Sequence, residues 1–211
     1  MILLENQRGK RLAFYDVPKN ASTSIKKACL EAMGKGDEYA FFGEQFIEDG
    51  KRIDNSEASE SYKKDKSDKR DYHDAWQNSP FNPVEADYRI CIFRDPVDRF
   101  SSGYNHIVKR LRESDMSANE MVERMIHGMF HNNHFFPQTF FLGRDIHYYT
   151  HACDFKNLKD LEPTFSEFFG VDVKLPHLQT SGSEFDSEIT EELRAKLRKI
   201  YNSDYKTFYN G

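Results

Sequence analysis

Two short apolar segments in this chain each end at a polar loop that opens a helical pattern. The segments are residues 12–17 (LAFYDV) and 88–93 (YRICIF), and the loops are residues 18–24 (PKNASTS) and 94–102 (RDPVDRFSS). Loops that follow parallel strands lie at the same edge of a sheet, so we expect these two loops to meet. Backbone N–H groups at helix starts, together with Lys19 and Arg94, suit an anion such as phosphate.

The order of these patterns predicts an α/β fold, a layered sandwich with a mainly parallel sheet flanked by helices. A length of 211 residues suits one domain over residues 1–211. From about residue 44 to 79 the chain is polar and highly charged, which indicates an insert or lid within that domain.

Hydrophobic spacing and turn residues predict the remaining elements. Helices are expected over residues 23–33, closed by Gly34, and over 97–111, and a third is expected after the capping-box residues Ser117 and Glu120. Residues 146–150 resemble a strand. Short helical elements are expected to begin at Phe155 and, with Thr164 as its cap, before Gly170; an amphipathic helix is expected near residues 193–208.

Composition excludes several classes of protein. The 30 Lys and Arg residues against 35 Asp and Glu give a formal charge of −5, which argues against a general nucleic-acid binder. No segment has the pattern of a signal peptide or membrane span, so we expect a soluble, cytoplasmic protein with no membrane partner. The three widely separated cysteines, Cys29, Cys91 and Cys153, are expected to be free thiols.

Beyond these patterns, the two loops resemble the motifs of the sulfotransferase superfamily that uses 3'-phosphoadenosine 5'-phosphosulfate (PAPS). Residues 18–24 look like the family's 5'-phosphosulfate loop, as in heparan sulfate 2-O-sulfotransferases, and Arg94 and Ser102 have the spacing of its 3'-phosphate motif. Residues 134–143 and 175–181 resemble later segments of Golgi-type carbohydrate sulfotransferases. These matches follow the family's order over most of the chain.

The resemblance implies a P-loop-like fold, PAPS as donor and adenosine 3',5'-bisphosphate as product, without a metal. It implies that Lys19 assists departure of the leaving phosphate, as a cation near that oxygen would. Arg94 and Ser102 are expected to hold the 3'-phosphate. The 5'-phosphosulfate is expected to bind the loop residues Lys19, Asn20, Ala21, Ser22, Thr23 and Ser24.

An acceptor hydroxyl also needs a base. His73, the only histidine between the two motifs, is the predicted base, with Glu44 and Glu48 as alternatives. His134, Gln138 and Trp76 are predicted to contact the acceptor, which the resemblance suggests is a carbohydrate or another small polar molecule.

A metal site is a second interpretation of the histidines. His127, His131 and His134 follow one another at helix-like steps, but a metal site needs converging ligands and oriented partners, so surface or acceptor-pocket histidines are favoured.

Two other functions stay open. An ATP-dependent phosphotransferase is disfavoured because residues 18–24 lack the glycines of a Walker A loop. A nucleotide-binding module without turnover is the other. The carbohydrate enzymes are usually anchored in the secretory pathway, and the absence of an anchor pattern here favours a compact cytosolic enzyme over one acting on glycosaminoglycans.

Overall fold

The computed structural model describes residues 1–34, 47–48, 51–52, 80–110, 114–175 and 189–209. The predicted insert at about 44–79 lies outside the described residues, apart from the short strands β3 (Ile47–Glu48) and β4 (Lys51–Arg52). Whether residues 1–211 form a single domain stays a prediction.

A four-stranded sheet forms the centre of the described chain. Its strands are β1 (Ile2–Glu5), β2 (Arg11–Tyr15), β5 (Tyr88–Phe93) and β6 (His151–Asp154), in the order β1-β2-β5-β6. Strands β2, β5 and β6 are parallel, and β1 pairs with β2 in the antiparallel sense. The mainly parallel sheet confirms the predicted α/β class, and β1 is an addition that the sequence patterns did not predict.

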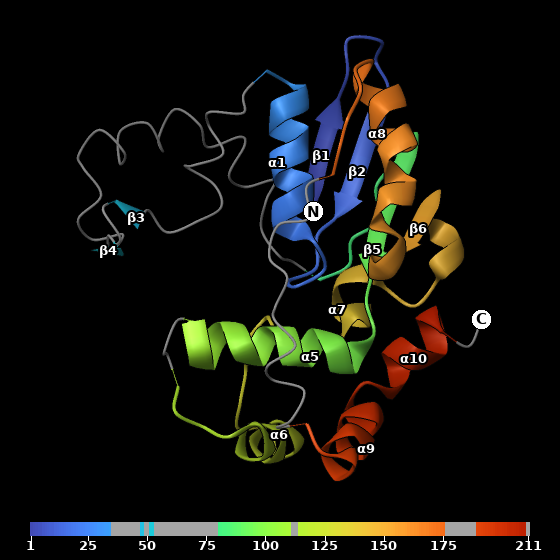
Figure 1. Ribbon diagram of the computed structural model, residues 1–211. Helices are drawn as coiled ribbons and strands as arrows, with labels where there is room; N and C mark the ends of the chain where they lie inside the picture. Colours follow the sequence, from blue (N-terminus) through green and yellow to red (C-terminus); the bar gives the residue numbers. More distant parts are fainter. Residues whose placement is uncertain (35–46, 49–50, 53–79, 111–113, 176–188, 210–211) are drawn as a thin grey trace.

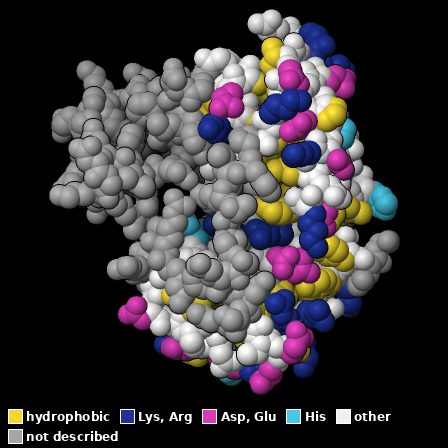
Figure 2. All heavy atoms as spheres, viewed as in Figure 1, with side chains coloured by type: hydrophobic (Ala, Val, Ile, Leu, Met, Phe, Trp, Pro, Cys, Tyr) yellow, Lys and Arg dark blue, Asp and Glu magenta, His cyan; other side chains and the backbone are white. Residues whose placement is uncertain are grey.

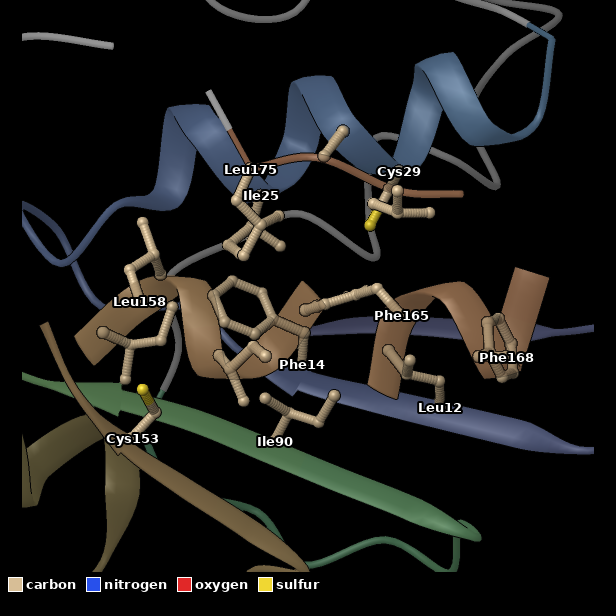
Figure 3. Packing of buried hydrophobic residues seen from close by; sticks show 14 of the residues in the cluster. Leu12, Phe14, Ile25, Cys29, Ile90, Cys153, Leu158, Phe165, Phe168 and Leu175 are labelled. Carbon is tan, nitrogen blue, oxygen red and sulfur yellow. The ribbon is translucent and has the colours of Figure 1, made fainter. Parts of the chain in front are cut away.

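Helices cover both faces of the sheet, which gives three layers. Leu12 and Phe14 of β2 face a core made with α1 (Ser22–Ala32) and α8 (Glu162–Phe169), whereas Ala13 and Tyr15 face the opposite core. Figure 3 shows the first core, with Phe14 and Phe165 packed between the strands and α1. The opposite core includes residues of α7 (Gln138–Leu142) and α10 (Asn202–Phe208). The alternation of side chains along a strand explains both cores.

A helical group lies beyond the carboxyl ends of β2 and β5 (Figure 1). It contains α5 (Pro96–Tyr104), which continues as a π-helix (Asn105–Arg110), together with α6 (Ala118–Ile126) and α9 (Glu191–Ile200). These helices share a third apolar core around Phe100 and Leu197. The group therefore faces the edge of the sheet where the two loops were expected.

Local signals were right for several helices and wrong for others. Ser117 caps α6 by accepting the N–H of Glu120, as predicted. Residues 146–150 are not a strand: a 3-10 helix (Ile146–Tyr148) forms there because the carboxylate of Asp145 accepts the N–H of His147, and β6 begins only at His151.

Two further boundaries differ from the prediction. Thr164 does not cap α8, because the helix begins at Glu162 with Pro163 in its first turn, where proline is favoured. The expected helix over 193–208 is split into α9 and α10 at Tyr201, whose buried hydroxyl donates to the carbonyl of Phe135.

All three cysteines are free, as predicted, and they are also buried. Burial raises the pKa of Cys29 to about 12 and that of Cys153 to about 11. In the described part of the chain, none of the helices has the length and apolar character needed to cross a bilayer. Figure 2 shows acidic and basic side chains mixed over the described part of one face.

Candidate active site

The loop between β2 and α1 (the β2–α1 loop, residues 16–21) has an unusual backbone. Lys19 and Ala21 have φ values of 71° and 62°, in the left-handed region that non-glycine residues rarely adopt. The N–H of Asn20 donates to the carbonyl of Val17, which tightens the turn. Strain of this kind persists where the surroundings fix the backbone, and it is concentrated at functional sites.

The loop opens α1 without a capping side chain. Ala21 is the N-cap, and the first turn of α1 contains no acidic residue. The helices α5, α6 and α9 differ, because side chains of Asp95, Ser117 and Thr190 accept their first N–H groups. The start of α1 therefore keeps the N–H groups and positive dipole end that suit a bound anion. The start of α5 does not offer its N–H groups to an anion, because the carboxylate of Asp95 accepts them.

The two loops meet, as the sequence predicted. Nη1 of Arg94 donates to the carbonyl oxygen of Lys19 at 3.2 Å, and the guanidinium carbon lies 4.5 Å from the centre of the Phe155 ring. Burial lowers the pKa of Arg94, while the carboxylates of Asp98 and Asp95 oppose that effect. An arginine stays charged under such a shift. Lys19 and Arg94, two cationic residues that follow different strands, therefore lie next to each other.

A fully buried arginine supports this junction from within the helical group. Nε of Arg99 donates to the carbonyl of Pro18 at 3.0 Å, and its Nη atoms donate to the carbonyls of Phe136 at 2.7 Å and Asn133 at 3.4 Å. Arg99 has no exposed surface. Its fork joins the β2–α1 loop to the segment that carries His134.

Two buried amides connect the loops a second time. Nδ2 of Asn20 donates to Oε1 of Gln138 at 2.6 Å and to the carbonyl of Ile92 at 2.7 Å. Gln138 also accepts the N–H of Arg94 and donates to its carbonyl, at 2.9 and 2.8 Å. Gln138 is completely buried, so these contacts give it a positioning task. The predicted contact of Gln138 with an acceptor stays a prediction.

The C-terminal helix holds Gln138 in turn. The carboxylate of Asp204 accepts the N–H groups of Gln138 and Thr139, at 2.8 and 2.9 Å, and is fully buried. Asp204 therefore ties α10 to the start of α7. The sequence did not indicate this residue, because Asp204 stands among the polar and charged residues of the expected amphipathic helix.

Asp16 was also missed, although it directly follows β2. Its carboxylate forms an ion pair with Lys26 at 2.8 Å and accepts a hydrogen bond from the hydroxyl of Ser22. The same hydroxyl lies 2.9 Å from the carbonyl of Val17. Ser22 thus stabilises the turn between β2 and α1. An acidic residue at a strand end, ten residues before a lysine on the following helix, was the available signal.

The other predicted donor-binding residues lie on α1 and α5. Thr23 is partly buried, and Ser24, with Ser102 of α5, is buried. Beside Ser102, a Cβ atom on Gly103 would come within 3.1 Å of the ring of Phe135. This close approach of α5 to residues 134–135 favours glycine, because any larger residue would press against the Phe135 ring.

His134 lies near the charged groups of Lys19 and Arg99. Its Nδ1 is 2.8 Å from Oδ1 of Asn132, and its ring centre is 5.3 Å from that of His106. Burial, and then the charges of Lys19, His106 and Arg99, lower the pKa of His134 to about 4. The imidazole is therefore neutral near pH 7.

Several predicted residues cannot be placed at this site. His73, Trp76 and Glu44 lie outside the described residues, and only the backbone of Glu48, in β3, is described. His127 and His131 are exposed. Among the described residues, no three His, Cys, Asp or Glu side chains converge as metal ligands would.

A model of the sulfotransferase family matches residues 6–210. The chain belongs to the sulfotransferase family. No curated protein and no solved structure gives a match. The matched range contains both loops, Arg99, Gln138 and Asp204. As a member of the family, the chain is a transferase of sulfuryl groups.

Proposed function

We propose that this chain transfers a sulfuryl group from PAPS to a hydroxyl, or less readily an amine, of a carbohydrate or another small polar acceptor. The observation that carries the proposal is the contact between Arg94 and the carbonyl of Lys19, which brings two cationic residues from separate strand ends together. A donor with phosphate groups at both the 3' and 5' positions suits such a pair.

The residues present suit this donor. The uncapped start of α1 offers N–H groups to the 5'-phosphosulfate, with Lys19 beside it. The guanidinium of Arg94 suits the 3'-phosphate, and the hydroxyl of Ser102 can donate a further hydrogen bond to it. The start of α5 is not available for this phosphate, because the carboxylate of Asp95 already accepts its first N–H groups. Lys19 and the start of α1 would neutralise the negative charge that develops on the leaving phosphate, while the acceptor oxygen attacks sulfur in line.

The proton of the acceptor hydroxyl must also be removed. The sequence predicts His73 for this step, with Glu44 and Glu48 as alternatives, and none of their side chains is described. A cytoplasmic location, and the lack of nucleic-acid and membrane partners, likewise stay predictions.

Calorimetric titration with three nucleotides tests the donor. Adenosine 3',5'-bisphosphate is expected to bind at least about tenfold more tightly than adenosine 5'-phosphate or ATP, since each lacks the group that Arg94 would hold. Binding of ATP that equals or exceeds that of the bisphosphate would contradict the proposal and favour a phosphotransferase.

Turnover needs a separate measurement. Transfer of ³⁵S from labelled PAPS to a panel of saccharides and small alcohols is expected for at least one acceptor. Tight bisphosphate binding without transfer to any acceptor, or to water, would instead indicate a binding module.

A further inference from the structure

The hydrogen bonds around His134 fix its tautomer. Oδ1 of Asn132 lies 2.9 Å from the backbone nitrogen of His134 and 2.8 Å from the ring nitrogen Nδ1. A backbone N–H can only donate, so the Asn132 atom that it meets must be the amide oxygen. That oxygen can only accept, which requires a proton on Nδ1. The neutral ring therefore carries its lone pair on Nε2.

The backbone on both sides of this imidazole is held in place. The carbonyls of Asn133 and Phe136 accept hydrogen bonds from Arg99, whose Nε also holds Pro18, the residue before Lys19. One buried guanidinium thus fixes the spacing between the segment of His134 and the β2–α1 loop. A base in an active site needs this kind of support.

Burial and the positive groups around the ring keep it unprotonated in the protein without donor. The groups that act on His134 are the ammonium of Lys19, the guanidinium of Arg99 and the ring of His106. All three oppose protonation in the protein without donor. A bound donor would add negative charge beside Lys19 and so raise the proton affinity of the ring during transfer.

We propose that His134 is a catalytic base of the transfer reaction, with Nε2 accepting the proton of the acceptor hydroxyl, and that Asn132 is the positioning residue that selects this tautomer. The inference rests on the proposed sulfuryl transfer and assigns a residue within the same site. It replaces the weaker assignment of His134 as an acceptor contact alone.

The proposed step balances as follows. The acceptor oxygen forms a bond to sulfur, and its proton passes to Nε2 of His134. The bond between sulfur and the 5'-phosphate oxygen breaks, and its electron pair stays on adenosine 3',5'-bisphosphate next to Lys19. The imidazolium then loses its proton to solvent.

The test compares variants in the full chain. His134→Asn introduces a side-chain amide that can donate to Asn132 in place of Nδ1, but this amide cannot act as a base. His134→Gln is a second variant if the first folds poorly. His127→Asn, on an exposed histidine, is the matched control, and His73→Asn tests the base predicted from the sequence. Each is assayed for ³⁵S transfer from PAPS to water and to the saccharide panel, and for binding of adenosine 3',5'-bisphosphate.

Loss of a general base is expected to lower kcat of His134→Asn by about 10²- to 10⁴-fold. Bisphosphate binding is expected to stay within about threefold of wild type, since the base acts on the acceptor. Asn132→Leu is expected to lower kcat and shift the acid limb of its pH profile, which a merely structural role would not do. Nitrogen-15 spectra of the wild-type ring are expected to show Nδ1 protonated.

Two results would overturn the inference: transfer by His134→Asn at a rate close to wild type, or a wild-type ring protonated at Nε2. Either can occur while the wild-type protein transfers sulfuryl groups, and then only the base assignment fails. A wild-type protein that shows neither transfer nor selective bisphosphate binding would contradict the proposed function itself.

Discussion

Nε of Arg99 donates to the carbonyl oxygen of Pro18 at 3.0 Å, so a buried charge on α5 holds the turn that carries Lys19. The same guanidinium binds two carbonyls on the other side, those of Asn133 and Phe136. No carboxylate hydrogen-bonds to it among the described contacts; its charge is distributed over carbonyl oxygens. Burial lowers the pKa of Arg99, and Tyr201 and Asp204 oppose this shift.

Replacement of Arg99 by lysine is expected to destabilise the fold. A lysine has the charge but not the planar fork, so at least one buried carbonyl loses its donor. The free energy of unfolding is expected to fall by about 3 kcal/mol, measured by urea denaturation. Arg124→Lys, at an exposed pair with Glu120, is the control and is expected to change it by less than about 0.5 kcal/mol. Equal stabilities of the two variants would contradict the role of Arg99.

Asp204→Asn tests the link between the C-terminal helix and the site. Asp204 accepts two N–H groups, whereas an asparagine offers one oxygen and turns an NH₂ group toward the second donor. Unfolding free energy is expected to fall by about 2 kcal/mol. Because Asp204 holds Gln138, bisphosphate affinity is expected to fall as well. Asp115→Asn, at an exposed position, is the control, and an unchanged affinity in Asp204→Asn would separate α10 from the site.

Arg94→Lys addresses recognition of the 3'-phosphate. Loss of the planar fork is expected to weaken binding of adenosine 3',5'-bisphosphate by about 10- to 100-fold. Binding of adenosine 5'-phosphate is expected to change little, because it lacks the group in question. Calorimetry on both nucleotides gives the comparison. Equal losses for the two would show that Arg94 acts on the loop through the carbonyl of Lys19 and not on the 3'-phosphate.

The three thiols are expected to resist alkylation in the folded protein. Cys29 is almost fully buried, and its raised pKa leaves almost no thiolate at pH 8. Reaction with iodoacetamide is expected only after urea is added, as mass spectrometry of the intact protein would record. Rapid modification of a folded thiol would show that the cores of the sheet open readily.

The parts of the site that the sequence predicted are those determined by neighbouring residues. A short apolar run followed by a polar loop and a helix start locates Lys19 and Arg94 at strand ends, and the parallel sheet then brings them together. Cap residues such as Ser117 were found for the same reason. Local chemistry decides these features, so a single sequence shows them.

The contacts that hold the site depend instead on tertiary packing. Asn20 meets Gln138 from 118 residues away, and Gln138 meets Asp204 from 66 residues away. No spacing rule links such pairs, so the sequence did not predict these contacts of Gln138, and Asp204 was not singled out. The strand expected at 146–150 does not form, because the Asp145 side chain accepts a backbone N–H and so competes with strand pairing.

The pKa of His134 makes stability depend on pH. In the unfolded chain its pKa is near 6.5, whereas in the folded protein burial and the charge of Lys19 lower it to about 4. As pH falls through this range, the unfolded state binds a proton before the folded state does, so folding loses stability. The contribution of His134 to the free energy of unfolding is complete above the pKa of the unfolded chain. It falls by up to about 3 kcal/mol as pH decreases toward the pKa of the folded protein.

Urea denaturation of wild type and His134→Asn at about pH 7.5, 5.5 and 4.5 measures this contribution by difference, since other groups titrate in both proteins. The stability difference between them is expected to change steadily in favour of His134→Asn as pH falls. His127→Asn, at an exposed histidine, is expected to follow wild type throughout. A difference between wild type and His134→Asn that stays constant across this range would mean that the ring is not held neutral beside Lys19, and it would remove the electrostatic basis for its role as a base.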